Sequence, residues 1–164
     1  RPKNDANTPT VAAANDVNIT AVEPNKIPDI AVEKSPAVLW PLLKNIDVAA
    51  TISRGIWIVF MYHNDCPTCT ECIPTYEQYA RDMQGNEDAI RFAFIEMPPY
   101  ESAEKRLVPQ DTVALTGRLD ESRKWIYATP VVTLLFDGEV LGAWDGSKGT
   151  CPTLDELFKA MEKW

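Results

Sequence analysis

Three cysteines lie close together in the stretch YHNDCPTCTECIP, which covers residues 62–74. Cys66, Cys69 and Cys72 are spaced three residues apart, and this spacing suits two kinds of chemistry. A Cys-x-x-Cys pair at the start of a helix can close a reversible disulfide, because residues i and i+3 lie on one helix face. Three thiolates could instead bind zinc or an iron–sulfur cluster, with Cys151 as a fourth ligand. The spacing alone leaves both open.

The redox interpretation gives the first two cysteines different roles. Free N–H groups and the positive end of the helix dipole stabilise a thiolate at a helix N-terminus. We therefore predict that Cys66 is the nucleophile and that Cys69 resolves the mixed disulfide that Cys66 forms with a client. Pro67 and Thr68 complete the motif. Asp65 places a carboxylate beside Cys66, which should oppose thiolate formation.

The motif lies between a predicted strand and a predicted helix. Residues 56–62, IWIVFMY, are β-branched and aromatic, which is typical of a strand buried on both faces of a parallel sheet. The sequence CIPTYEQYARDMQGNED that follows has helical composition, with a kink expected at Pro74. Before the strand, AVLWPLLKNIDVAATISRG predicts an amphipathic helix that ends at Gly55.

The rest of the chain predicts a second strand, a long connection, a hairpin and a closing helix. Residues 91–97 form the second buried strand, and we expect a helix within 111–125 in the connection of residues 98–128. Residues 129–146 read as two strands about an Asp-Gly turn. A Thr-x-x-Glu capping box begins the last helix at residues 153–156. This order predicts an α/β sandwich around a mixed sheet, because the early strands need parallel crossovers.

These motifs together resemble the thioredoxin-like family. Residues 66–69 stand where that family has its redox motif, and Pro74 stands where the family kinks the same helix. The dipeptide Thr129-Pro130 opens the hairpin where the family has a cis-proline. The resemblance covers about residues 37–164 and implies a three-layer sandwich, with a central mixed β-sheet flanked by helices. It also implies that Pro130 is cis and that Thr129 and Pro130 hold a substrate peptide in an extended form beside the cysteines.

The chain departs from the thioredoxin pattern near the motif. Asp65 replaces the usual tryptophan, and Phe60 stands where thioredoxins place a buried acid. Pro67 is more similar to the glutaredoxins and some disulfide-exchange proteins, and the connection before Pro130 is longer than in thioredoxin. The direction of electron flow therefore stays open.

Cys72 and Cys151 have three alternative states. In the fold that the resemblance implies, the cysteine-bearing helix and the final helix cover the same face of the sheet and begin at its active-site end, so these two cysteines would approach each other. They could form a disulfide, or remain two buried thiols, which is the commoner outcome for such a pair. The third state makes them metal ligands beside Cys66 and Cys69.

Composition limits the partners. The 164 residues carry a net charge of -8, with scattered lysines and arginines, which disfavours nucleic acid. No apolar run approaches the roughly 20 residues that cross a bilayer. Residues 1–36 have no aromatic residue and no sustained period, so we expect an extended leader or tether before a domain of residues 37–164. With no methionine or signal-type segment at its start, the chain is expected to be a processed product in an extracytoplasmic setting, periplasmic or secreted.

We therefore predict a thiol-disulfide oxidoreductase that uses Cys66 and Cys69, with no bound organic cofactor and no metal. Its partners would be protein thiol or disulfide clients and an unidentified redox partner. Two alternatives remain, a thioredoxin-fold binding module without redox turnover and a protein with a cysteine-ligated metal or iron–sulfur cluster.

Overall fold

The computed structural model describes residues 38–85 and 89–163. The predicted leader, residues 1–36, lies outside the described residues. In chain order the elements are η1 (Pro41–Asn45), α1 (Ala49–Ile52), β1 (Ile56–Tyr62), α2 (Pro67–Asp82), β2 (Arg91–Glu96), η2 (Ala103–Lys105), β3 (Leu115–Arg118), β4 (Val131–Phe136), β5 (Glu139–Trp144), η3 (Gly146–Lys148) and α3 (Leu154–Met161). None of the described helices is long and apolar enough to span a membrane.

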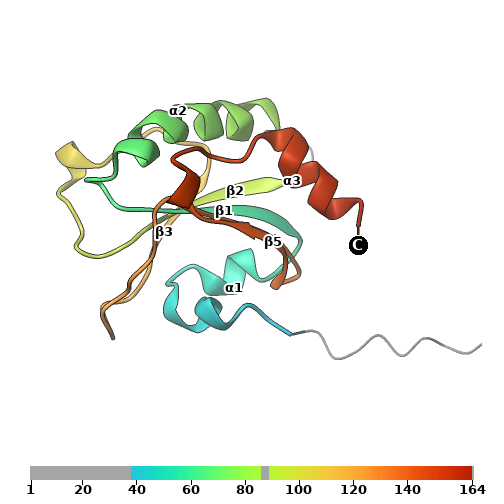
Figure 1. Cartoon of the computed structure of the whole chain (residues 1–164), viewed down its shortest axis with the longest axis horizontal. Helices are drawn as coiled ribbons and strands as arrows, with labels where there is room; N and C mark the ends of the chain where they lie inside the picture. Colours follow the sequence, from blue (N-terminus) through green and yellow to red (C-terminus); the bar gives the residue numbers. More distant parts are fainter. Residues whose placement is uncertain (1–37, 86–88, 164) are drawn as a thin grey trace, which may run out of the picture. The chain divides into compact units, whose positions relative to one another are not determined.

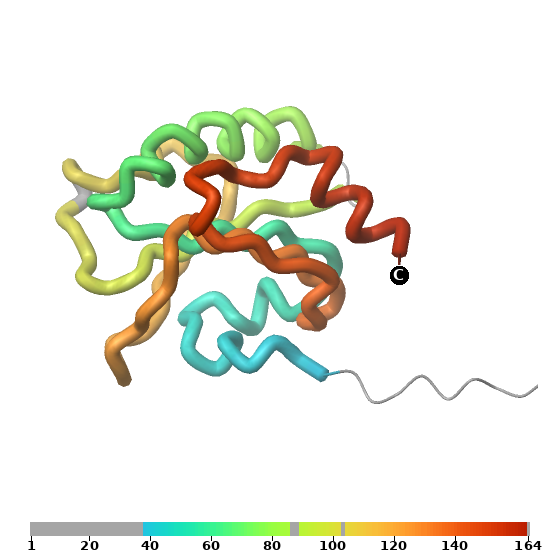
Figure 2. Tube along the Cα trace, in the orientation of Figure 1, coloured from blue at the N-terminus to red at the C-terminus, as the bar shows by residue number. Residues whose placement is uncertain are grey.

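The five strands form one mixed sheet in the order β3-β2-β1-β4-β5. β1 runs parallel to β2 and β2 parallel to β3, whereas β4 is antiparallel to both β1 and β5. α2 and α3 cover one face of the sheet, and α1 covers the other (Figures 1 and 2). The predicted three-layer α/β sandwich with a central mixed sheet is therefore confirmed.

The central strand β1 explains why its sequence is apolar without interruption. All of its residues after Ile56 are buried, and successive side chains enter opposite layers. Ile58, Phe60 and Tyr62 join the core under α2, and Trp57, Val59 and Met61 join the core under α1. The Phe60 ring packs 4.9 Å from the Tyr76 ring of α2, measured between centroids. This packing fixes α2 over the end of β1, where the cysteine motif begins.

The single helix predicted before β1 is wrong. The chain forms two short helices instead, η1 and α1, with an extended residue, Ile46, between them. Ile46 pairs with Leu119 in an isolated β-bridge, and the Asp47 N–H donates to the Arg118 carbonyl over 3.1 Å. The pairing with a distant segment interrupts the helical period that the local sequence favours.

The helix predicted within residues 111–125 is also wrong, because residues 115–118 form the edge strand β3. β3 pairs in parallel with β2 and packs closely against the segment before α1. A Cβ added at Gly117 would lie 2.5 Å from Cγ2 of Val48. The glycine therefore permits a close approach that a helix would not require. After β3 and the buried Leu119, residues 120–128, which we call the arm, project from the sheet (Figure 1, orange).

Candidate redox site

Cys66 is the N-cap residue of α2, and its sulfur faces the free amides of the first turn. Its backbone is extended, with φ -86° and ψ 112°, and Pro67 begins the helix. The Cys69 N–H donates to Sγ of Cys66 over 3.1 Å. Thr70 returns a hydrogen bond from Oγ1 to the Cys66 carbonyl over 3.2 Å. The helix start therefore stabilises negative charge on the Cys66 sulfur.

Cys66 and Cys69 form a disulfide with a Cα–Cα distance of 5.2 Å. Cys69 is fully buried, whereas Cys66 keeps 8% of its surface exposed. Both belong to the apolar cluster that contains Phe60, so no acid lies at that position beneath the pair. A partner approaching from solvent can therefore reach Cys66 but not Cys69. Asp65, the residue before Cys66, is exposed at the rim of the site.

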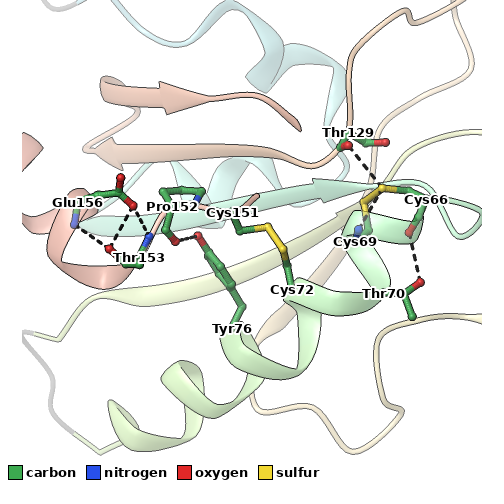
Figure 3. Close-up of a disulfide and its surroundings, with 10 residues drawn as sticks. All are labelled: Cys66, Cys69, Thr70, Cys72, Tyr76, Thr129, Cys151, Pro152, Thr153 and Glu156. Carbon is green, nitrogen blue, oxygen red and sulfur yellow. Dashed lines mark hydrogen bonds between the residues drawn. A yellow bond between two sulfur atoms is a disulfide. The ribbon is translucent and has the colours of Figure 1, made fainter. Parts of the chain in front are cut away.

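The peptide bond between Thr129 and Pro130 is cis, as the resemblance implied. The carbonyl oxygen of Thr129 lies 3.5 Å from Sγ of Cys66, although the two residues are 63 positions apart (Figure 3). Antiparallel pairing explains this, because the start of β4 lies beside the end of β1. The structure thus brings together the two motifs that the sequence analysis singled out.

Gly146 supports the cis-proline segment and was missed by the sequence analysis as a site residue. Its N–H donates to the Ala128 carbonyl over 3.0 Å. A Cβ added here would lie 2.8 Å from the Pro130 nitrogen and would collide with the Thr129 carbonyl. Only glycine allows this approach. The sequence signal was a glycine just past the hairpin, which does not reveal what it contacts.

A second disulfide joins Cys72 of α2 to Cys151, with a Cα–Cα distance of 6.2 Å. The hydroxyl of Tyr76, one turn further along α2, donates to the Pro152 carbonyl over 2.7 Å (Figure 3). Burial raises the pKa of Tyr76 well above its usual value, which keeps the hydroxyl protonated as a donor. The capping box that starts at Thr153 then begins α3. The disulfide is therefore one part of a joint between α2 and α3.

The two disulfides use all four cysteines of the chain. Within residues 38–85 and 89–163, no group of three or more His, Cys, Asp or Glu side chains is placed to hold a metal ion. The four-thiolate arrangement considered from the sequence would require both disulfides to be reduced.

No known family model and no curated protein matches the chain. Solved structures do match it. A secreted disulfide oxidoreductase of Mycobacterium tuberculosis, described as homologous to DsbE of E. coli, superposes with a TM-score of 0.51 at 16% identity, covering 71% of this chain and 87% of that one. A candidate thiol:disulfide interchange protein, DsbE of Chlorobium tepidum, also gives 0.51, at 10% identity, covering 68% of this chain and 80% of that one. The chain has a thioredoxin-like fold.

A buried carboxylate organises the long connection of this thioredoxin-like fold. Glu96 ends β2 with 3% of its surface exposed. Its Oε1 accepts a hydrogen bond from Nδ2 of Asn64 over 2.8 Å, and its Oε2 pairs with Arg118 at 3.2 Å and with Arg106 at 3.5 Å. Burial, with Glu96 nearby, raises the pKa of Tyr62 to about 12. This ionic centre ties the connection to Asn64, two residues before Cys66, and the sequence analysis did not identify it.

Proposed function

We propose that the protein is a thiol-disulfide oxidoreductase that acts on protein thiols and disulfides through Cys66 and Cys69. One observation carries the proposal, namely the Cys66–Cys69 disulfide at the start of α2, with Cys66 facing the carbonyl of Thr129 beside a cis-proline. The matched proteins of Mycobacterium tuberculosis and Chlorobium tepidum are described as a disulfide oxidoreductase and a candidate interchange protein, and these descriptions support the same activity here.

In the oxidising direction, a client thiolate attacks Sγ of Cys66. The bond between Cys66 and the client forms, the bond between Cys66 and Cys69 breaks, and Cys69 leaves as a thiolate. A second client thiolate then attacks the client sulfur of the mixed disulfide, so that Cys66 leaves as a thiolate held by the helix start. The client has lost two electrons and the cysteine pair has gained them. The reducing direction is the same sequence reversed.

Other predicted site residues act around this exchange. Thr129 and Pro130 hold the client backbone beside Cys66 in an extended form. Pro67 and Thr68 set the short ring between the two cysteines, and the Asp65 carboxylate raises the energy of the Cys66 thiolate. A partner that restores the cysteine pair to its working redox state is required, because each turnover leaves the pair in the opposite state.

The setting that we propose is extracytoplasmic, with residues 37–164 as the working domain. A disulfide away from the exchanging pair, Cys72–Cys151, is typical of an oxidising compartment. The matched Mycobacterium protein is described as secreted, which supports the same setting.

The proposed function is tested by trapping. In Cys69→Ser the resolving thiol is missing, so mixed disulfides between Cys66 and client proteins should accumulate and be visible on non-reducing gels. The matched variant Cys66→Ser should trap none, because Cys69 is buried. If neither variant traps a client, or if only Cys66→Ser does, the proposal or the assignment of roles is wrong.

A further inference from the structure

The arm carries apolar side chains into solvent next to the site. Ile126 is 81% exposed and Tyr127 is 42% exposed. They precede Thr129 and Pro130 in one continuous segment, and the Thr129 carbonyl contacts Cys66. Neighbouring exposed apolar residues beside a functional site indicate a surface that contacts a partner.

The backbone of the same segment is unpaired. Within the part of the chain that the structure describes, the N–H and C=O groups of residues 124–127 have no hydrogen-bond partner. Pairing resumes at Ala128, whose carbonyl accepts from Gly146. An unpaired backbone of this kind can accept an extended peptide as an added strand.

The arm is nevertheless held in place by its own contacts. The Trp125 indole donates from Nε1 to the Asp120 carbonyl over 2.5 Å, and its ring stacks on Tyr127 with 6.4 Å between centroids. The Arg123 guanidinium lies 4.8 Å from the Trp125 ring centroid. At the base, the Asp120 N–H donates to the Asn45 carbonyl over 2.8 Å. A partner therefore meets a largely ordered surface, which lowers the entropy cost of binding.

A cavity of about 400 Å³ lies beside the end of the arm. Its lining combines the apolar or aromatic side chains of Tyr127, Val131 and Trp144 with the charged side chains of Asp145, Lys148 and Glu156. Val131 follows Pro130 directly, so the cavity adjoins the segment that contacts Cys66. A pocket of this size and mixed lining can take one large apolar side chain of a peptide.

We propose that the arm selects the client. An extended polypeptide adds along residues 124–127, its cysteine reaches Cys66, and an apolar or aromatic side chain near that cysteine packs against Ile126 and Tyr127. The preferred substrate class is thus an extended or unfolded polypeptide with an apolar residue close to its cysteine, and not a small thiol. This inference rests on the proposed function and specifies the clients of the same site.

The test compares three disulfide substrates of the reduced protein. They are oxidised glutathione, the disulfide-linked dimer of a cysteine peptide with phenylalanine near the cysteine, and the disulfide-linked dimer of the same peptide with serine in place of phenylalanine. We expect Tyr127→Ser and Ile126→Ser each to lower kcat/KM for the phenylalanine peptide about tenfold, mainly through KM. The reaction with glutathione should be unchanged. Val140→Ser, at a residue of β5 that is 39% exposed, is the matched control and should change nothing.

A binding measurement separates this inference from the proposed function. A fluorescent phenylalanine peptide with serine in place of its cysteine cannot exchange disulfides, so its anisotropy reports docking alone. If Tyr127→Ser weakens the binding of this peptide about tenfold, the result supports the arm as the docking surface. If the peptide binds in this way but no disulfide substrate is reduced, the proposed function is wrong and the docking inference stands. The inference is overturned if the peptide binds the unchanged protein and Tyr127→Ser equally, or binds neither of them. It is also overturned if the phenylalanine and serine peptides react at equal rates.

Discussion

Both disulfides of this protein involve cysteines of α2, but different structures surround them. Cys66–Cys69 closes a ring over three positions at the start of α2, whereas Cys72–Cys151 joins positions 79 apart. The first faces the free amides of the helix and the cis-proline segment. The second lies within a joint that also contains the Tyr76–Pro152 hydrogen bond. We infer that the surroundings of each bond, and not the bond itself, decide which of the two exchanges.

Opening the two bonds has different consequences for the chain. When Cys66–Cys69 opens, the helix start stabilises the thiolate that forms on Cys66, and little chain is released. When Cys72–Cys151 opens, the constraint on a long loop is lost, and Cys72 has no free helical amides beside it because it lies one turn inside α2. We therefore regard the first as the exchanging bond and the second as a structural cross-link.

The largest expected effect is a difference in how much each disulfide contributes to the free energy of unfolding. Removing the long cross-link with Cys72→Ser and Cys151→Ser should lower the free energy of unfolding by about 4 kcal/mol in the loop-entropy model. The same model gives about 2 kcal/mol for Cys66→Ser with Cys69→Ser, because the closed ring is short. Denaturant unfolding without reductant measures both. Equal losses would show that the two bonds do not differ in this way.

A smaller effect tests the support beneath the exchanging bond. Gly146→Ala places a methyl group against the Thr129 carbonyl and should destabilise the fold by about 1–3 kcal/mol, as overpacking does. The rate of mixed-disulfide formation should fall as well, because the cis-proline segment must shift. Gly85→Ala is the control, since a Cβ there meets nothing within 4 Å and the change strains only the backbone, at a φ of 92°, after the end of α2. Equal rates of mixed-disulfide formation in the two variants would show that Gly146 has no part in positioning the site.

Tyr76→Phe sharpens the account of the structural joint. The change leaves the buried Pro152 carbonyl without its donor and should cost about 1–3 kcal/mol of stability. If the hydrogen bond and Cys72–Cys151 act together, the loss should be smaller once that disulfide has been removed. A double-mutant cycle by denaturant unfolding measures this coupling. Strictly additive losses would mean that the two contacts are independent.

The smallest effect concerns the carboxylate beside Cys66. Asp65→Asn removes a negative charge that disfavours the thiolate, so alkylation of the reduced protein by iodoacetamide should shift to lower pH. Solvent screens an exposed charge, so the shift should be modest and should shrink in high salt. A profile that stays in place or moves to higher pH rejects the electrostatic account.

The sequence predicted the parts of the fold that local pattern determines. The run in β1 is apolar at every position because both of its faces are buried, and the capping box at Thr153 forms as a local contact. The cysteine motif was placed correctly because it follows one such strand and starts a helix. The cis bond at Pro130 followed from the resemblance and not from the residues alone.

The errors fall where distant segments decide the local structure. The helix expected before β1 is broken at Ile46 because that residue pairs with Leu119. The helix expected within residues 111–125 is replaced by β3, because the open edge of β2 takes a strand. Glu96 and Gly146 were missed for the same reason, since their partners lie far away in the chain. The Cys72–Cys151 bond was left open among three states and depended on topology.

The most direct test of the account is a redox titration that follows all four cysteines separately. The protein is equilibrated in glutathione buffers of increasing reducing strength, quenched with acid and alkylated, and the state of each cysteine is read by mass spectrometry. The account predicts that Cys66 and Cys69 open at a potential where Cys72 and Cys151 are still joined. It would be contradicted if the two pairs opened together, or if Cys72–Cys151 opened first.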